Sequence, residues 1–360
     1  MSELPINRRQ YLELEKLAIG AFSPLTGFMN EEDFVSVVEQ LRLADGTPFP
    51  LPVVLDLSRD QAHAVEGVGR AMLLYEGDEV GTISPQSFYS CDKESVSKKI
   101  FGTCDSRHPG VAHFLRMGTT FVGGKVELYK RPVSEFSRYE LTPQETRTCF
   151  SERGWQSIVG FQTRNVPHRA HEYLQRLALE QHDGLFIQPL IGARKRGDYS
   201  PEAILAGYEK LIGSFLPKDR IVLGVLSTSM RYAGPREAVF HAIVRRNYGC
   251  THFIIGRDHA GVDDYYPEYA GHTLASSFGD ELGIEPLLLY GPYHCRLCEG
   301  IVSERTCPHS KTNPVAITEI SGTMVRRILS RNEPCSPWLI RPEVVDSVQG
   351  LSMFIEEDAE

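Results

Sequence analysis

Hydrophobic and polar positions follow two different patterns along the chain, and the change falls near Trp155. Beyond that residue, short apolar runs alternate with stretches in which apolar residues recur every three to four positions, the pattern of strands alternating with amphipathic helices. The predicted strands are Ser157–Phe161, Leu185–Ile191, Ile221–Leu226, His252–Ile255 and Pro286–Tyr290. The predicted helices lie near His168–Gln181, Pro201–Phe215 and Pro235–Tyr248. Near-continuous apolar strands separated by helices indicate an α/β domain with a parallel sheet covered on both faces.

Residues 1–150 show shorter apolar runs that are broken by Gly, Pro and Asp. The predicted strands here are Leu51–Leu57, Ala71–Tyr75, Thr119–Val122 and Val126–Tyr129, and the predicted helices are Glu31–Leu41 and Asp92–Phe101. Short strands punctuated in this way indicate a small, barrel-like α+β domain. The region contains no evident catalytic constellation, so we expect a structural or assembly role for it.

The last part of the chain reads as a small helical cap. Ser321-Gly322-Thr323 supplies capping chemistry for a helix at 324–329, and Pro342–Val348 forms a second predicted helix. The predicted division is therefore 1–150 for the first domain, 151–317 for the α/β domain and 318–360 for the helical region.

Polar motifs follow four predicted strands of the α/β domain: Gln162–Asn165, Gly192–Asp198, Ser227–Tyr232 and Gly256–Gly261. The carboxyl ends of parallel strands meet at one edge of a sheet, and ligands bind there. We therefore expect these four motifs to lie together around one site.

The loop after the first of these strands has the chemistry of an anion site. Asn165 is the predicted N-cap and Pro167 the first helical residue, so free backbone N–H groups would face the loop. His168 and His171 then lie on one side of the first turn, and Arg164 adds a planar charged fork suited to a tetrahedral oxyanion. Zinc binding by the histidines is disfavoured because the HExxH spacing is absent. A structural role for two surface histidines is the plainer alternative.

Two further loops could contribute to the same site. Gly256 would let a ligand approach the backbone, and Arg257 and His259 supply positive charge beside it. The alternative for this motif is a tight turn with a salt-bridged Arg257–Asp258 face. Lys195 lies in a glycine-flanked loop that could close over phosphates or could simply be a solvated charge run.

Charge and composition narrow the classes of function. The net charge of −9 argues against broad binding of nucleic acid or of acidic membranes. No apolar run approaches membrane-spanning length, and the first residues have no signal-peptide core, so we expect a cytoplasmic protein.

The cysteines indicate a metal centre. Three of the eight crowd into residues 295–307, and Cys295, Cys298, Cys307 and His309 have the spacing of a tetrahedral zinc site. Four protein ligands leave no open position, which predicts a structural site in an insertion at 293–310. His294 is an alternative fourth ligand, and a redox CxxC motif is the competing interpretation.

Several motifs together resemble the ATP sulfurylase family. QTRN at 162–165, HRAH at 168–171 and GRDHA at 256–260 are similar to its signatures, and AFSPLTGFM at 21–29 resembles a run in its PUA-like N-terminal domain. The CRLC and CPH segments resemble a zinc-binding insertion of some bacterial members. The resemblance covers nearly the whole chain and implies a PUA-like α+β barrel domain, a Rossmann-like nucleotidyltransferase domain and a small helical cap.

The reaction implied by this resemblance is MgATP plus sulfate giving adenosine 5′-phosphosulfate and pyrophosphate, by in-line attack of sulfate on the α-phosphorus. The resemblance implies that sulfate is bound by Gln162, Arg164 and the Ala260 N–H, and that catalysis involves Thr163, Arg164, Asn165, His168 and His171. It implies that ATP is bound by Gln162, Thr163, Arg164, Asn165, Gly256, Arg257, Asp258, His259 and the Leu289 backbone. It further implies a phosphate loop that carries Lys195. A homo-oligomer is expected. No GxxxxGK[ST] loop is present, so the resemblance does not extend to members with an attached kinase.

The sequence departs from the family pattern at two places. Val166-Pro167 stands where many members have Pro and a further residue, and Pro286 stands where some carry an aromatic.

Two alternative functions stay open: another HxxH nucleotidyltransferase with a different acceptor, and an RNA-binding protein built on the PUA-like domain and the zinc knuckle. The acidic charge counts against the second. Either direction of the sulfurylase reaction is compatible with these residues.

Overall fold

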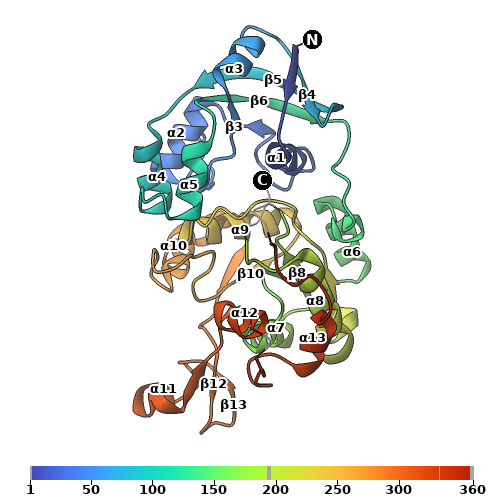
Figure 1. Ribbon diagram of the computed structural model, residues 1–360, viewed down its shortest axis with the longest axis vertical. Coiled ribbons are helices and arrows are strands. Elements are labelled where there is room, and N and C mark those ends of the chain that lie inside the picture. Colours follow the sequence, from blue (N-terminus) through green and yellow to red (C-terminus); the bar gives the residue numbers. More distant parts are fainter. Residues whose placement is uncertain (1, 193–195, 332, 357–360) are drawn as a thin grey trace.

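A computed structural model describes residues 2–192, 196–331 and 333–356 (Figure 1). An N-terminal part with its own sheet lies at the top of Figure 1, a larger α/β part lies below it, and a small three-stranded module projects at the bottom. The predicted Lys195 lies outside the described residues.

The N-terminal part contains a six-stranded mixed sheet. Its strands run in the order β1 (Ser2–Pro5), β4 (Ala71–Tyr75), β5 (Asp78–Tyr89), β6 (Thr120–Leu128) and β2 (Gly27–Phe28), with β3 (Leu55–Leu57) also paired to β6. The helices around it are α1 (Arg8–Ala18), α2 (Glu31–Gln40), α3 (Arg59–Val65), α4 (Lys93–Phe101) and α5 (Pro109–Arg116).

Three strand predictions in this part were wrong. The two strands predicted at 119–122 and 126–129 are one strand, β6, whose apolar pattern is interrupted by Gly123 and Gly124. A Cβ on Gly124 would lie 2.1 Å from the Ser84 carbonyl oxygen, so glycine permits the close approach of β5. Strand β5 itself was missed because polar residues and Pro85 dilute its pattern. The strand predicted at 51–57 is shortened to β3, since Pro52 cannot donate to a ladder.

The α/β part contains the predicted parallel sheet. The strand order is β11 (Glu285–Leu288), β10 (His252–Ile255), β7 (Ile158–Thr163), β8 (Gly184–Pro189) and β9 (Ile221–Leu223), and every pairing is parallel. Its helices are α6 (Pro143–Glu152), α7 (Arg169–Gln181), α8 (Pro201–Phe215), α9 (Pro235–Asn247) and α10 (Ala270–Phe278). Four short 3-10 turns lie at Ser137–Tyr139, Lys218–Arg220, Gly279–Leu282 and Pro314–Ala316.

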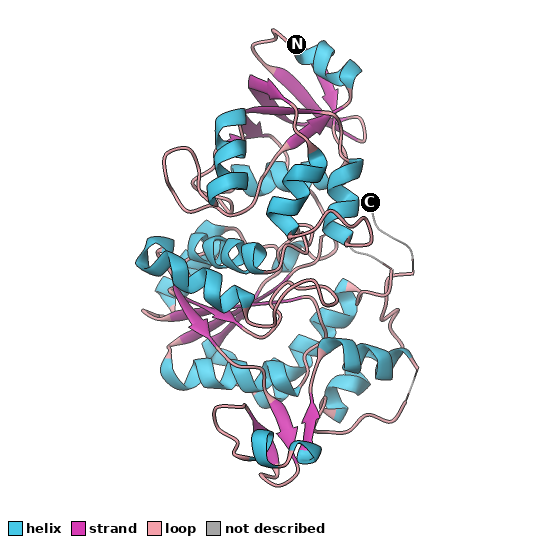
Figure 2. Cartoon of the chain, turned by 90° about the vertical axis from the view of Figure 1, so that its left-hand side faces the viewer, coloured by secondary structure: helices cyan, strands magenta, loops and turns pink. Residues whose placement is uncertain are grey.

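Side chains alternate between two cores across this sheet. In β8, Phe186 packs into the core that includes α9, α10 and the N-terminal part, whereas Leu185 and Ile187 pack into the core of α7 and α8. Figure 2 shows the sheet strands running between the two layers of helices. The sheet is therefore covered on both faces, as its near-continuous apolar strands predict.

Helix α9 joins the two parts of the molecule. It is buried on nearly every side, which explains why its apolar residues do not form one stripe. Phe240 packs against Phe22 at a ring-centroid distance of 5.2 Å, and Arg236 donates hydrogen bonds to the Val37 and Val38 carbonyls at 3.1 and 2.9 Å. The N-terminal part is thus docked on α9 through both apolar and polar contacts.

The C-terminal region confirms the predicted cap. Helices α12 (Gly322–Ser330) and α13 (Pro342–Val348) lie where they were expected, and Ser321 caps α12 by accepting the Met324 N–H at 3.2 Å. The projecting module consists of β12 (Tyr293–Cys295), β13 (Gly300–Val302), β14 (Ile317–Glu319) and α11 (His309–Thr312). Among the helices of the described ranges, none has the length and apolarity that crossing a membrane requires.

Candidate active site

One pocket gathers the predicted motifs at the carboxyl edge of the parallel sheet. Its volume is about 530 Å³. The predicted residues that line it are Gln162, Thr163, Arg164, Asn165, His168, His171, Gly256, Arg257, Asp258, His259 and Ala260. Strands β7 and β10 are neighbours in the sheet, so the loops that follow them meet at this edge. The expectation is confirmed for the motifs after β7 and β10, whereas Met230 alone lines the pocket from Ser227–Tyr232 and no described residue of Gly192–Asp198 does.

The start of α7 differs from the prediction. The helix begins at Arg169, and His168 is its N-cap, with its Nδ1 accepting the His171 N–H at 3.4 Å. Asn165 was predicted as the cap, which is wrong. Pro167 disfavours the helical region for the residue before it, so Val166 keeps the chain out of the helix. The cap is therefore one of the two site histidines, which fixes the orientation of its ring.

The two histidines of the HxxH motif stack on each other. The ring centroids of His168 and His171 lie 3.7 Å apart with an interplanar angle of 26°. Burial lowers the pKa of His168 to about 4, and burial together with His168 lowers the pKa of His171 well below its usual value. Because His168 Nδ1 accepts a backbone N–H, its proton sits on Nε2. His168 is thus a neutral hydrogen-bond donor at neutral pH.

Arg164 is held at the base of the pocket with spare donor capacity. Its guanidinium lies over the Tyr232 ring, 5.1 Å from the centroid, and Nη2 donates to the Gly261 carbonyl at 3.4 Å. Its Nη1 is buried and has no hydrogen-bond partner among the described residues. A buried guanidinium nitrogen without a partner is a costly arrangement, and an anion in the pocket would satisfy it.

A second arginine reaches the pocket from the C-terminal cap. Arg326, on α12, donates to Asn165 Oδ1 at 3.0 Å and lies 3.4 Å from an Asp198 carboxylate oxygen. Gly322 leaves room for this contact, since a Cβ there would lie 2.7 Å from Asn165 Nδ2. Arg326 was not predicted as a site residue, because the pattern at 321–329 indicates only a capped helix. The sequence signal that could have identified Arg326 is its position near the start of the helix that Ser321 caps.

The GRDHA loop has an unusual backbone and carries a carboxyl group into the pocket. Asp258 and Ala260 have positive φ angles of 50° and 58°. Burial raises the pKa of Asp258 to about 6, against the opposing charges of Arg164 and Arg257. The alternative of an Arg257–Asp258 salt bridge is not supported, because Arg257 faces Glu319 at 3.6 Å.

Carboxylates are numerous at this pocket. Besides Asp258, it is lined by Asp263, Asp264, Glu268 and Glu319. Arg164, Arg257 and Arg326 line the same pocket, so the pocket offers both positive and negative charge. Such a mixture suits a ligand that is an anion with a bound divalent cation.

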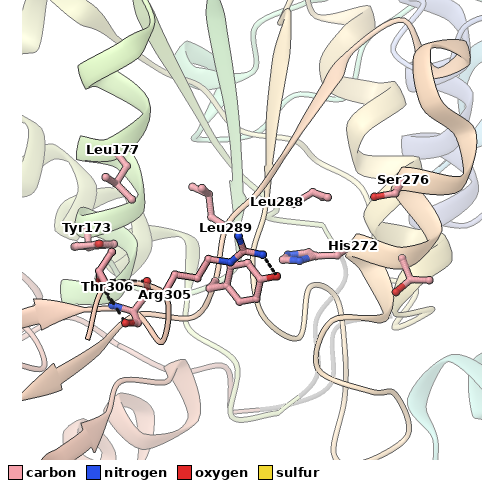
Figure 3. A pocket seen from close by; sticks show the side chains of 11 residues that line it. Tyr173, Leu177, His272, Ser276, Leu288, Leu289, Arg305 and Thr306 are labelled. Carbon is pink, nitrogen blue, oxygen red and sulfur yellow. Dashed lines mark hydrogen bonds between the residues drawn. The ribbon is translucent and has the colours of Figure 1, made fainter. Parts of the chain in front are cut away.

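Leu289 lies outside this pocket and lines a neighbouring one of about 450 Å³ beside strand β11 (Figure 3). Its N–H donates to the Ile255 carbonyl at 3.1 Å, which extends the pairing of β11 with β10. Arg305 closes the other side by donating to the Tyr290 hydroxyl at 2.6 Å. The structure therefore does not bring Leu289 into the set that lines the main pocket.

The projecting module holds a compact cluster of metal-binding side chains. One ligand atom from each of Cys295, Cys298, Cys307 and His309 lies within 4.8 Å of all the others. The Cys298 and Cys307 sulfurs are 3.7 Å apart, and His309 Nδ1 lies 3.3 Å from the Cys298 sulfur. A tetrahedron with metal–sulfur bonds of about 2.3 Å has edges of about 3.8 Å. These four side chains fit a tetrahedral metal ion.

The alternative fourth ligand is used differently. His294 stacks on Trp338 with the ring centroids 4.4 Å apart and an interplanar angle of 17°. His309, not His294, belongs to the cluster.

Fold and pocket together define the class: an α/β protein of the nucleotidyltransferase type, with a pocket lined by arginines and histidines at the end of its parallel sheet and an N-terminal PUA-like domain. A family model described as ATP-sulfurylase matches residues 137–350, and a model described as PUA-like domain matches residues 1–131. The chain belongs to the ATP-sulfurylase family.

Curated relatives support this membership. The chain is 43% identical to a sulfate adenylyltransferase of Pyrococcus abyssi, over 98% of this chain and 92% of that protein. It is 45% identical to one of Aeropyrum pernix, over 96% and 89%, and 44% identical to one of Deinococcus radiodurans, over 95% and 88%.

One solved structure has the same fold at low sequence identity. It is described as a hexameric APS kinase from Thiobacillus denitrificans, with a TM-score of 0.75 and 23% identity. The match covers 98% of this chain but 63% of that one, so the chain spans less than two thirds of the solved protein's length. At this identity the likeness shows the fold alone.

Proposed function

We propose that this chain is a sulfate adenylyltransferase, which converts MgATP and sulfate into adenosine 5′-phosphosulfate and pyrophosphate. The observation that carries the proposal is the buried Arg164 Nη1, which lacks a partner among the described residues and lies in the pocket lined by the family's motifs. The names of the relatives point to the same activity.

The chemistry requires positioning more than covalent help from the protein. A sulfate oxygen attacks the α-phosphorus, a new phosphorus–oxygen bond forms, and the bond to the bridging oxygen of the β-phosphate breaks to release pyrophosphate. Both reactants are anions, so the pocket must hold them in line and offset their repulsion. No protein nucleophile is needed.

In this proposal sulfate lies against Arg164, with Gln162 and the Ala260 N–H completing its site. The Tyr232 ring fixes the guanidinium plane, which leaves Nη1 to donate to the oxyanion. A planar fork held in this way suits a tetrahedral anion better than a mobile ammonium would.

The catalytic loop and the histidines act on the charge that develops at the α-phosphorus. His168 donates from Nε2–H, and its neutral ring is already oriented by the cap contact with the His171 N–H. Asn165 donates its N–H to Thr163 Oγ1 at 3.1 Å and is anchored by Arg326, so the loop is held before substrate arrives. Preorganised donors of this kind stabilise a transition state at little cost in reorganisation.

The nucleotide is assigned to Gly256, Arg257, Asp258 and His259, with the Leu289 backbone and the Lys195 loop as further contacts. Mg²⁺ arrives with ATP and neutralises part of the triphosphate charge. The pocket carboxylates face this cation, which accounts for their presence in a site for anions.

The Cys295, Cys298, Cys307 and His309 cluster holds a structural Zn²⁺ in this proposal. When bound, zinc cross-links strand β12 to the segment around α11. The module has only a small core of its own, made by Tyr293, Cys295, Cys307 and Ala316, so such a cross-link would add to its stability.

We also propose that the chain is divided into an N-terminal domain at 1–150, a catalytic domain at 151–317 and a helical region at 318–360. We expect a homo-oligomer that uses small-molecule substrates and binds neither nucleic acid nor membrane. A reduced thiolate cluster and the use of ATP favour a cytoplasmic setting.

The reverse reaction tests the proposal directly. Wild-type protein should form ATP from adenosine 5′-phosphosulfate and pyrophosphate in the presence of Mg²⁺, and Arg164→Ala should lose most of this activity. ATP formation that does not require adenosine 5′-phosphosulfate, or none by a folded wild-type protein, would remove the assignment.

A further inference from the structure

Behind the GRDHA loop, His259 and two buried side chains form a line that leads away from the pocket. His259 Nε2 lies 3.1 Å from His241 Nδ1, and His241 Nε2 lies 3.5 Å from a Glu237 carboxylate oxygen. Glu237 and His241 are almost completely buried, and both lie on α9 at a spacing of four residues. Of the three, only His259 lines the pocket.

Glu237 is held as an acceptor. Its Oε1 accepts the Arg231 N–H at 2.8 Å and its Oε2 accepts the Ala233 N–H at 3.0 Å. Burial raises the pKa of Glu237, while these backbone donors and the Arg231 charge act in the opposite direction. Two N–H donors, one on each oxygen, favour the ionised carboxylate.

The two rings are neutral imidazoles. Burial and the Arg245 charge lower the pKa of His259 to about 3, and they lower the pKa of His241 well below its usual value. A neutral ring carries one N–H and one lone pair. Facing nitrogens at 3.1 Å therefore need one donor and one acceptor, which leaves only two arrangements for the whole line.

In the first arrangement Glu237 is ionised, His241 carries its proton on Nε2, 3.5 Å from the Glu237 carboxylate oxygen, and His241 Nδ1 accepts the His259 Nε2–H. In the second, Glu237 is protonated and donates to His241, and His259 is left with its proton on Nδ1. Both Glu237 oxygens accept a backbone N–H and Arg231 adds positive charge, which favours the first arrangement against the effect of burial, which raises the pKa of Glu237. His259 Nδ1 then carries a lone pair, and no hydrogen bond to this atom occurs within the described ranges.

We infer that Glu237 and His241 are positioning residues that fix the tautomer of His259, so that its Nδ1 accepts a hydrogen bond from a donor group of the nucleotide. This inference rests on the proposed use of ATP. Phosphate oxygens of ATP can only accept, so they cannot pair with a lone pair on Nδ1. The donors that ATP itself carries are the ribose hydroxyls and the adenine amino group, and the waters on Mg²⁺ are the other donors that arrive with it. We assign the His259 contact to the nucleoside part, and the analogue test below distinguishes this contact from one to a Mg²⁺-bound water.

The first test is a spectrum of the wild-type protein, which needs no variant. Nitrogen-15 NMR of labelled histidine distinguishes Nε2–H from Nδ1–H rings. We expect His259 as the Nε2–H form, and an Nδ1–H form would overturn the inference. Glu237→Gln offers an amide donor to His241, and in a folded variant we expect the His259 proton to move to Nδ1.

The second test is nucleotide binding measured by calorimetry, without turnover. His241→Phe removes both contacts of the line, and we expect the dissociation constant for MgATP to rise about tenfold, as for one lost hydrogen bond. Ile243→Val is the matched control: Ile243 is fully buried on the same helix but lies outside the line, and its substitution should leave the dissociation constant unchanged.

Nucleotide analogues then identify the donor. In 2′-deoxy-ATP, 3′-deoxy-ATP or inosine triphosphate, one candidate donor is missing, and for one of the three we expect the tenfold difference between wild type and His241→Phe to vanish. An equal difference for all three would overturn the inference. Binding and ring spectra do not require sulfate, so a lack of sulfate-dependent turnover would remove the proposed function and leave the histidine result standing.

Discussion

Arg326 donates a hydrogen bond to Asn165 Oδ1 at 3.0 Å, which ties helix α12 of the C-terminal cap to the loop after strand β7. The two residues are separated by 161 positions in the chain. The cap is thus part of the pocket wall, and the loop after strand β7 is tied to a residue outside the parallel sheet.

Arg326→Ala should lower kcat/KM by roughly tenfold to a hundredfold, because Asn165 loses its anchor and the pocket loses a positive charge. The melting temperature should change little, since Arg326 is partly exposed. Steady-state kinetics checks the first statement and calorimetry the second. Arg327→Ala is the matched control, because Arg327 is the exposed neighbour with the same charge. Equal losses in the two variants would contradict a specific role for Arg326.

His168→Ala should lower kcat by roughly two to three orders of magnitude, the size expected for a lost donor to developing charge. His168 is buried and is the cap of α7, so a thermal melt must accompany the kinetics to show that the variant is folded. His63→Ala, at an exposed position of α3, controls for the loss of an imidazole elsewhere. A folded His168→Ala variant with near-wild-type kcat would remove the assignment.

The depressed pKa of His168 makes a separate prediction about pH. Its folded pKa is about 4 against an ordinary 6.5, so the folded protein keeps it neutral while the unfolded chain takes up a proton below 6.5. Its contribution to stability is therefore complete above pH 6.5 and is lost as the pH falls towards 4. We expect kcat/KM to show no protonation step of this histidine between about pH 6 and pH 8. A step near 6.5 that disappears in His168→Gln would contradict the neutral-donor role.

Glu172 joins helix α7 to the C-terminal region through Arg341 and also binds two arginines of α7 itself. Arg341 donates two hydrogen bonds to it at 2.8 and 2.7 Å, and Arg169 and Arg176 each donate one at 2.9 Å. Glu172 is 3% exposed. Glu172→Gln should reduce the free energy of unfolding by about 2 to 4 kcal/mol, because three guanidinium groups lose a common partner.

The pH dependence of this stability loss follows from the Glu172 pKa. Burial raises the pKa of Glu172, but the hydrogen bonds from Arg341 and Arg176 and the charge of Arg169 lower this pKa below 4.5 overall. The wild-type advantage over Glu172→Gln is therefore present above pH 4.5 and should shrink as the pH falls below it. Urea unfolding at neutral and acidic pH measures both variants. Glu180→Gln, at an exposed position of the same helix, is the control.

Removal of the metal should destabilise the projecting module before the rest of the molecule. We expect wild-type protein to carry one zinc ion per chain. Cys298→Ser or a strong chelator should lower the melting temperature of the part of the unfolding transition that belongs to the projecting module. Cys104→Ser, which changes a free cysteine outside the cluster, should leave the zinc content and the melting curve unchanged. A full zinc content in Cys298→Ser would contradict the assigned ligand set.

The parallel sheet could be predicted from the sequence because its strands are short apolar runs, four of which are followed by a polar motif. Topology then places the loops after β7 and β10 together, whereas the cap residues that complete the pocket wall do not follow from strand order. Strand β5 could not be predicted in this way, since it pairs through its backbone and carries few apolar residues.

The contacts of Arg326 and Glu237 could not be predicted for a different reason. Each depends on a partner distant in sequence or on a backbone donor in another loop, and neither leaves a periodic signal. The cap at His168 was missed because Asn165 is the better cap by residue type, whereas Pro167 and the Arg326 contact assign Asn165 elsewhere.

Pyrophosphate release from MgATP, with sulfate and without it, tests the central claim most directly. Release by wild-type protein should depend strictly on sulfate, with one adenosine 5′-phosphosulfate formed per pyrophosphate, and Arg164→Ala should lower the rate by roughly two to three orders of magnitude. Release that is independent of sulfate, or that proceeds equally well with a different acceptor, would contradict the account.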